Sequence, residues 1–184
     1  MRVVWISILV MSTGCSQKSD KQKFIDYIND PDNKITQQIK IGEVQTTVKW
    51  LSPDFQRLKN GGQGMDSVAT TNEGFYYFDV KFDKVKGDKP AKEKLLYLDF
   101  DMQNDFMLLQ RKDSILPAIC QKIENGVPGS YQYMLVFEKK DNGSDDHDFA
   151  LIYKDKIFAT GVLAFVYKQK DIRKIPKLNF EKSK

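Results

Sequence analysis

The sequence predicts a mainly β fold, an antiparallel β-sandwich with an N-terminal hairpin and short helices. From residue 73 to residue 172, apolar and polar residues alternate in several short segments, as in strands that bury one face. Polar turns separate these segments at short intervals, with little helical periodicity between them. Parallel strands need long crossover connections, which are usually helical. The pattern therefore favours an antiparallel sandwich over a parallel α/β fold.

A short amphipathic helix is predicted at the start of residues 23–72, an extension that precedes the β region. Phe24, Tyr27 and Ile28 have the i, i+3, i+4 spacing of one helical face. Pro31 follows, and the residue before a proline avoids helical angles. We expect the helix to end there.

A β-hairpin and a second helix complete this extension. Residues 35–51 alternate in two runs on either side of Gly42, which predicts two strands joined by a turn. Ser52 offers a capping hydroxyl, and Pro53 suits the first helical position because no amide donor is needed there. We therefore expect a short helix between Pro53 and Gly61.

The β region, residues 73–172, contains six predicted strands, each marked by alternation. They are residues 75–82, 96–101, 105–110, 131–137, 149–153 and 160–168. In the second of these, Leu96, Leu98 and Phe100 would share one face. Residues 116–129 contain two prolines and two glycines, which predicts a connection with one helical turn at residues 119–124.

The last predicted strand is apolar on both faces, unlike the others. One face holds Leu163, Phe165 and Tyr167, and the other holds Val162, Ala164 and Val166. Strands that read this way are typically buried on both sides. The sequence therefore predicts a central position in its sheet, or a cover over its outer face by the N-terminal hairpin and helices.

The first fifteen residues have the order of a bacterial secretion signal. Arg2 precedes an uncharged segment of 12 residues, and small residues then lead into Cys15. This segment is shorter than the roughly 20 apolar residues that span a bilayer, which disfavours a retained anchor. The sequence before Cys15 resembles the lipobox of bacterial lipoproteins, although Ser12 stands where the family usually has an aliphatic residue.

The lipobox resemblance implies a location and a modification. Residues 1–14 would be removed as a signal peptide, Cys15 would carry the lipid, and residues 15–22 would form a polar tether. Ser16 resembles the residue that follows the cysteine in lipoproteins passed on to the outer membrane. The resemblance thus implies a protein of the cell envelope, lipid-anchored at the outer membrane and facing the periplasm or the cell surface, with the membrane as its first partner.

The order of elements between Phe75 and Ile172 resembles immunoglobulin-like domains of exported bacterial lipoproteins. The similar segments are residues 76–80, 105–117 and 164–167. Residues 27–33 resemble openings of uncharacterised Bacteroidota-type lipoproteins. The Cys, Trp, Cys signature of true immunoglobulin domains is absent, because Trp50 lies outside this region and Cys120 has no partner once Cys15 is lipidated. The resemblance implies a β-sandwich and no particular activity.

Charge bears on the expected partners. The formal net charge of +4 is too weak an excess to predict a nucleic-acid partner. Between Lys168 and Lys184, however, seven basic residues stand against two acidic ones. The tail of residues 173–184 is either a solvated end or a contact for anionic lipid or polysaccharide. An envelope protein or a polysaccharide is the expected partner class besides the membrane.

The single histidine excludes much enzyme chemistry. A Ser or Cys triad needs an imidazole beside its nucleophile, whereas His147 lies among Asp145, Asp146 and Asp148 at a predicted hairpin tip, so no triad is predicted. We predict no catalytic residue, no cofactor and no zinc site, because zinc requires several His or Cys ligands. The nearby acids are weak calcium candidates, and a polar hairpin turn is the alternative. They are Asp141, Asp145, Asp146 and Asp148.

The leading hypothesis is therefore a non-enzymatic binding or structural module in the envelope. A carbohydrate-active hydrolytic domain is an alternative, because Asp99, Asp101 and Asp105 would project two carboxylates to one side of a strand. A subunit of a larger envelope complex is another alternative. An exposed apolar patch would favour that alternative.

Overall fold

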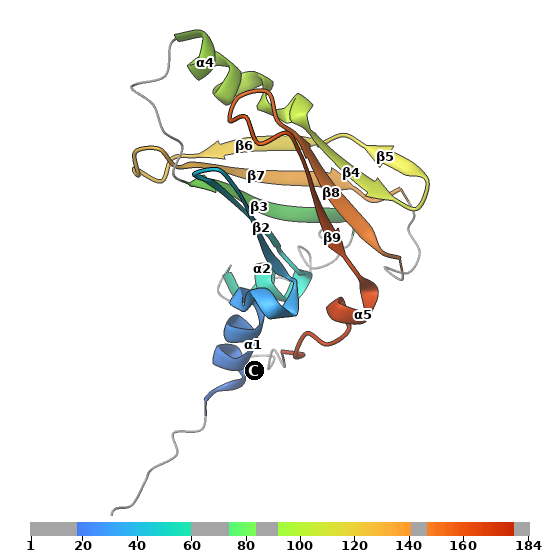
Figure 1. The fold of residues 1–184 in the computed structure, drawn as a ribbon. Coiled ribbons are helices and arrows are strands. Elements are labelled where there is room, and N and C mark those ends of the chain that lie inside the picture. The colour runs from blue at the N-terminus through green and yellow to red at the C-terminus, as the bar shows by residue number, and fades with distance from the viewer. Residues whose placement is uncertain (1–17, 60–73, 84–91, 141–146, 179–184) are drawn as a thin grey trace, which may run out of the picture.

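A computed structural model describes residues 18–59, 74–83, 92–140 and 147–178 (Figure 1). In this part of the chain nine strands form two antiparallel sheets that pack face to face, which confirms the predicted β-sandwich. The five-stranded sheet has the order β1 (Thr36–Ile41), β2 (Val44–Trp50), β3 (Phe75–Asp83), β7 (Tyr131–Glu138) and β6 (Ile119–Ile123). The four-stranded sheet has the order β5 (Asp113–Ile115), β4 (Phe106–Gln110), β8 (Phe149–Lys154) and β9 (Val162–Tyr167).

The N-terminal elements follow the predicted order. Helix α1 (Asp20–Asn29) begins after Ser19, whose hydroxyl accepts a hydrogen bond from the Gln22 N–H, and ends before the short 3-10 helix Pro31–Asn33. It therefore starts inside the segment expected as a tether. Helix α2 (Pro53–Lys59) follows the hairpin.

The predicted hairpin is an integral part of the sandwich. Strand β2 pairs with β3 along its whole length, with Val48 opposite Val80, so β1 and β2 extend the five-stranded sheet. The alternation of buried residues along β2 continues as far as Trp50, which is 7% exposed. Residues 35–51 and the β region thus share one core.

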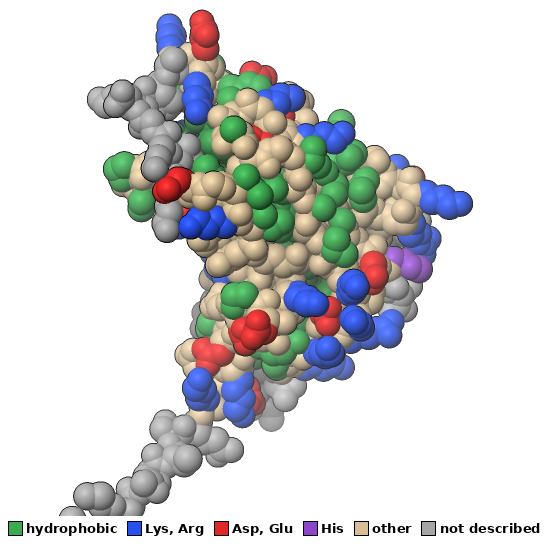
Figure 2. Space-filling model, in the orientation of Figure 1, with side chains coloured by type: hydrophobic (Ala, Val, Ile, Leu, Met, Phe, Trp, Pro, Cys, Tyr) green, Lys and Arg blue, Asp and Glu red, His purple; other side chains and the backbone are tan. Residues whose placement is uncertain are grey.

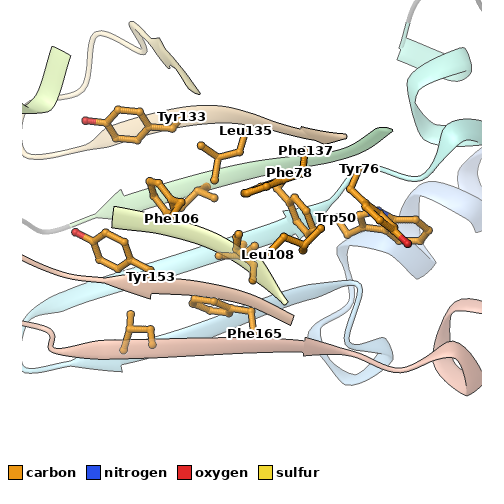
Figure 3. Packing of buried hydrophobic residues seen from close by; sticks show 14 of the residues in the cluster. Trp50, Tyr76, Phe78, Phe106, Leu108, Tyr133, Leu135, Phe137, Tyr153 and Phe165 are labelled. Carbon is orange, nitrogen blue, oxygen red and sulfur yellow. The ribbon is translucent and has the colours of Figure 1, made fainter. Parts of the chain in front are cut away.

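Aromatic side chains from both sheets fill that core (Figure 3). The ring of Phe82 on β3 lies 4.9 Å from that of Tyr153 on β8 and 4.8 Å from that of Phe158. At the other end, the ring of Phe149 lies 4.6 Å from Tyr76 and 5.2 Å from Tyr167. Offset and edge contacts of this kind join the sheets through large apolar surfaces.

The strand predicted at residues 96–101 is wrong, because residues 92–105 are helical. Helix α4 (Lys92–Leu96) runs into a π-helical turn (Tyr97–Asp101) and then a 3-10 turn (Met102–Asp105). Leu98 and Met102, four residues apart, are both buried on the sandwich, whereas Phe100 is 69% exposed. The Tyr133 hydroxyl donates a hydrogen bond of 2.9 Å to the Leu98 carbonyl, which ties the π-helical turn to β7.

The connection predicted at residues 116–129 contains a strand in place of a helical turn. Strand β6 pairs with the outer side of β7, with Ile119 opposite Val136 and Cys120 opposite Leu135. Pro117 lies just before it, where a proline removes no ladder hydrogen bond. Pairing with a partner that is adjacent only in the fold overrides the local turn signals.

The central or covered position predicted for the last strand is also wrong. Strand β9 is the edge of the four-stranded sheet, and along it exposed and buried residues alternate strictly. The face that carries Val162, Ala164 and Val166 is exposed, and that which carries Leu163 and Phe165 is buried.

Candidate functional site

The outer face of the four-stranded sheet is the main candidate site. On β4, β8 and β9 its side chains are all apolar except that of Lys154, whereas Ser114 on β5, the register partner of Leu109, is polar. We call the seven apolar members the apolar face. They are Met107, Leu109, Ala150, Ile152, Val162, Ala164 and Val166. Strand register places them in rows, because residues paired across strands lie side by side on one face. One row is Met107, Ile152, Ala164, and the next is Leu109, Ala150, Val166.

This face differs from the outer face of the other sheet. Val162 and Val166 are 69% and 45% exposed, and no acidic residue belongs to the apolar face. On the five-stranded sheet the outward residues include Asp79, whose carboxylate accepts a hydrogen bond of 2.8 Å from Gln132, and its neighbour Lys81. Antiparallel sheets normally present polar residues to water, and contiguous exposed apolar residues mark interaction sites.

Lysines border the apolar face at both ends. Lys154 occupies the row of Val162, its register partner. Lys168 continues the alternation beyond Val166 with an extended backbone, and Lys112 lies in the turn between β4 and β5; all three are exposed. Figure 2 shows hydrophobic side chains over the region of β8 and β9, with Lys and Arg side chains gathered next to them over α5 (Gln169–Ile172).

A carboxylate organises the turn that positions β9. Asp155 accepts hydrogen bonds from the backbone N–H groups of Ile157, Phe158 and Thr160, and from the hydroxyls of Tyr153 and Thr160. Burial on its own would raise the pKa of Asp155, but the backbone N–H donors outweigh it and hold the pKa below its ordinary value. The turn is thus fixed by one ionised side chain.

A second carboxylate is buried under the helical segment. The Asp105 carboxylate is fully buried, and its Oδ1 accepts a hydrogen bond of 2.7 Å from the Tyr97 hydroxyl and lies 2.9 Å from the Lys156 ammonium. Its Oδ2 has no hydrogen-bond partner within the described part of the chain. The hydrogen bond to Asp105 raises the pKa of Lys156. This cluster explains how residues 97–105 are held on the sandwich.

Cys120 on β6 is half-buried and lies near this cluster. Burial, with a smaller effect of the Asp105 charge, raises the pKa of the Cys120 thiol to about 12. A thiol of this kind is protonated at neutral pH and is a poor nucleophile. Its side chain packs against the hydrophobic core as a small apolar group.

The predicted hydrolytic acids do not form a pair. Asp99 and Asp101 lie on the π-helical turn, and the alternation of a strand therefore does not apply to them. Asp99 Oδ1 lies 2.7 Å from the Lys122 ammonium, Asp101 is exposed, and Asp105 points into the interior. The strand premise of the hydrolytic alternative is wrong.

Of the calcium candidates, the structure describes only Asp148. Its Oδ1 accepts a hydrogen bond of 2.9 Å from the Gln169 N–H, and the carbonyl of His147 accepts one from the Gln169 side chain. The Nε2 of His147 contacts Arg111. Asp141, Asp145 and Asp146 lie outside the described residues, as does the lipidation candidate Cys15. Among described residues no group of three or more His, Cys, Asp or Glu side chains could hold a metal ion.

Comparisons with known proteins add a distant structural likeness. No protein-family model matches the sequence, and no curated protein shows significant similarity to it. The fold is similar to the crystal structure of a DUF4426 family protein from Pseudomonas aeruginosa, with a TM-score of 0.39 and 10% sequence identity. The match covers 73% of this chain and 92% of that chain.

None of the helices in the described ranges is both long and apolar enough to cross a bilayer.

The sequence shows the outer residues of the apolar face on β9, because Val162, Ala164 and Val166 form a second apolar side of one strand. The same pattern is typical of a strand buried on both sides, so it does not distinguish an exposed apolar side from a buried one. Their register with β8 and β4, and hence the contiguity of the face, required the sheet order.

Proposed function

We propose that this chain is a lipid-anchored protein of the bacterial envelope whose β-sandwich acts as a non-enzymatic binding or structural module. The lipobox resemblance at Cys15 supports the anchor and the outer-membrane location. The resemblance of residues 75–172 to immunoglobulin-like lipoprotein domains supports the β-sandwich as the form of that module.

The observation that carries the binding role is the apolar face. Its three members on β9 are exposed and its four members on β4 and β8 are half-buried, and a contiguous apolar area of this kind on a protein surface marks an interaction site. The ionisable groups, by contrast, serve the fold: Asp155 fixes a turn, Asp105 holds a helical segment and Asp99 pairs with Lys122. A binding module accounts for both sets of observations.

The anchor is tested by the processing of the full-length chain in a bacterial host. Globomycin, which blocks cleavage of lipoprotein signals, should make the precursor accumulate, and labelled fatty acid should be incorporated into the wild type. A Cys15→Ser variant should incorporate none. Normal processing under globomycin, or equal labelling of the variant, would show that Cys15 is not lipidated.

A subunit role in a larger envelope complex is the second candidate. It is favoured by exposed apolar side chains on the helical segment at the end of the molecule opposite α1 (Figure 1). Leu95, Leu96 and Phe100 are 39%, 48% and 69% exposed. Co-purification in mild detergent should retain a partner with wild type and lose it with Leu96→Ser plus Phe100→Ser. Val127→Ser, at a residue 54% exposed elsewhere, is the matched control.

A further inference from the structure

We propose that the apolar face lies against an anionic lipid bilayer, with its side chains at the boundary of the acyl chains and its bordering lysines among the headgroups. This inference rests on the proposed function, because the lipid at Cys15 keeps the domain beside the membrane. It adds a second contact that orients the sandwich.

The composition of the face fits a bilayer surface. Val162, Ala164 and Val166 form an exposed apolar line along an edge strand, and Ile152 and Met107 extend it across the sheet. Surfaces that rest in the membrane interface combine such an apolar area with Lys or Arg at its border. No acidic side chain lies within this face, so none has to be desolvated on contact.

The charges around the face complement an anionic surface. Lys154 and Lys168 lie at opposite ends of β9, and Lys112 lies on the side of β4. The two nearest described acids at the ends of β8 have partners within the fold: Asp148 accepts from the Gln169 N–H, and Asp155 accepts from its own turn. The border of the face thus carries three exposed lysines, and each lysine near an anionic membrane adds binding energy.

The position of the anchor favours the same partner. Only four residues separate Cys15 from Asp20, the first residue of α1, so an extended chain between them spans at most about 18 Å. Helices α1 and α5 lie at the same end of the molecule, and β9 leads directly into α5 (Figure 1). A short tether raises the effective concentration of the face at the bilayer, which makes a weak contact sufficient.

A second copy of the chain fits the face less well. Two copies packed face to face would bring Lys112, Lys154 and Lys168 of each against a like-charged border. Like charges brought together at an interface oppose association. The same lysines attract anionic headgroups, so charge selects the bilayer.

The test reads depth of insertion in the full-length, acylated protein. Cys120→Ala removes the internal thiol, and an environment-sensitive dye is attached at Val162→Cys or, as a matched control on the other sheet, at Ile119→Cys. Ile119 is also exposed, at 52%, on edge strand β6. Each protein is reconstituted into phosphatidylcholine vesicles with or without phosphatidylglycerol, and a lipid-borne quencher is added. Mass spectrometry of the N-terminal peptide establishes acylation in the same samples.

We expect quenching at position 162 in anionic vesicles and little at position 119. Lys154→Gln and Lys168→Gln should each lower the ratio of docked to undocked protein about fivefold in anionic vesicles, with little effect in neutral ones. Equal quenching at both positions would overturn the proposal. The proposal would also be overturned if the protein were dimeric and the dye at position 162 were shielded from water but not quenched by the lipid-borne quencher. A second copy of the chain would then cover the face. If mass spectrometry shows no acyl group on the wild type, the lipid anchor is refuted. Flotation of that unacylated protein with vesicles still tests whether the apolar face docks on the bilayer.

Discussion

The turn between β8 and β9 gives the sharpest stability prediction, through the substitution Asp155→Asn. The Asp155 Oδ2 accepts hydrogen bonds of 2.5 Å from the Thr160 N–H and 2.9 Å from the Thr160 hydroxyl. An amide NH2 group in that position would face the Thr160 N–H with another donor. Hydrogen bonds to a charged group contribute roughly 1.5–3 kcal/mol each, and the site is partly open to solvent. We therefore expect a loss of about 2 kcal/mol in the free energy of unfolding at pH 7.

The pH dependence of this loss follows from the pKa of Asp155, which is lower in the folded state than its ordinary value of 3.8. A carboxyl group of this kind stabilises the fold above the unfolded-state pKa, and its contribution disappears as the pH falls through the folded-state pKa. The difference between wild type and Asp155→Asn should therefore be full at pH 7 and shrink below pH 3.8.

Urea denaturation at several pH values measures both quantities. Asp113→Asn is the control, because this exposed carboxylate makes one ion pair, at 3.5 Å from Lys140, and should change stability by less than about 0.5 kcal/mol. A loss at Asp155 no larger than that of the control would refute the role assigned to the turn. So would a loss that is the same at pH 7 and in acid.

Three further predictions concern the backbone, the core and the thiol. Ala159 has a φ of 58°, a left-handed conformation that glycine adopts more easily than alanine. Ala159→Gly should therefore raise the free energy of unfolding, measured by urea denaturation, by about 0.5–1 kcal/mol. Ala164→Gly, in the extended strand β9, should lower it. Phe82 is fully buried among aromatic rings of both sheets. Thermal denaturation should show that Phe82→Ala lowers the free energy of unfolding by about 3–5 kcal/mol and that Phe82→Leu lowers it clearly less. Equal losses for the two variants would argue against tight packing at this position. Because burial raises the pKa of Cys120 to about 12, its alkylation by iodoacetamide at pH 8 should be far slower in the native protein than in urea, and equal rates would contradict that burial.

Local periodicity predicted most strands but failed where two periods fit the same residues. Leu96, Leu98 and Phe100 alternate like a strand, whereas Leu98 and Met102 have helical spacing. The helical spacing is the one that the structure adopts, because it buries both Leu98 and Met102 on the sandwich and lets the Tyr133 hydroxyl donate a hydrogen bond to the Leu98 carbonyl. Residues 119–123 show the opposite case. Their local sequence predicts a turn, but they form a strand because they pair with the open edge of β7.

The candidate site was predictable in its residue types and not in its arrangement. The apolar outer residues of β9 were evident in the sequence, but an apolar face arises only when Ala164 lies beside Ile152, and Ile152 beside Met107. The two pairs are separated by 12 and 45 positions in the chain, and no local pattern encodes their pairing. The carboxylates followed the same rule: Asp99, Asp101 and Asp105 are neighbours in sequence, but the π-helical turn separates them.

Alternation is a local property that each strand carries in its own residues, so an antiparallel sandwich can be predicted before any strand pairing is known. That β9 is an edge strand with one uncovered apolar side cannot be predicted in this way, because an edge or a central position depends on which strands share main-chain hydrogen bonds. That sharing depends on pairing between residues far apart in the chain, such as Met107 on β4 with Ile152 on β8.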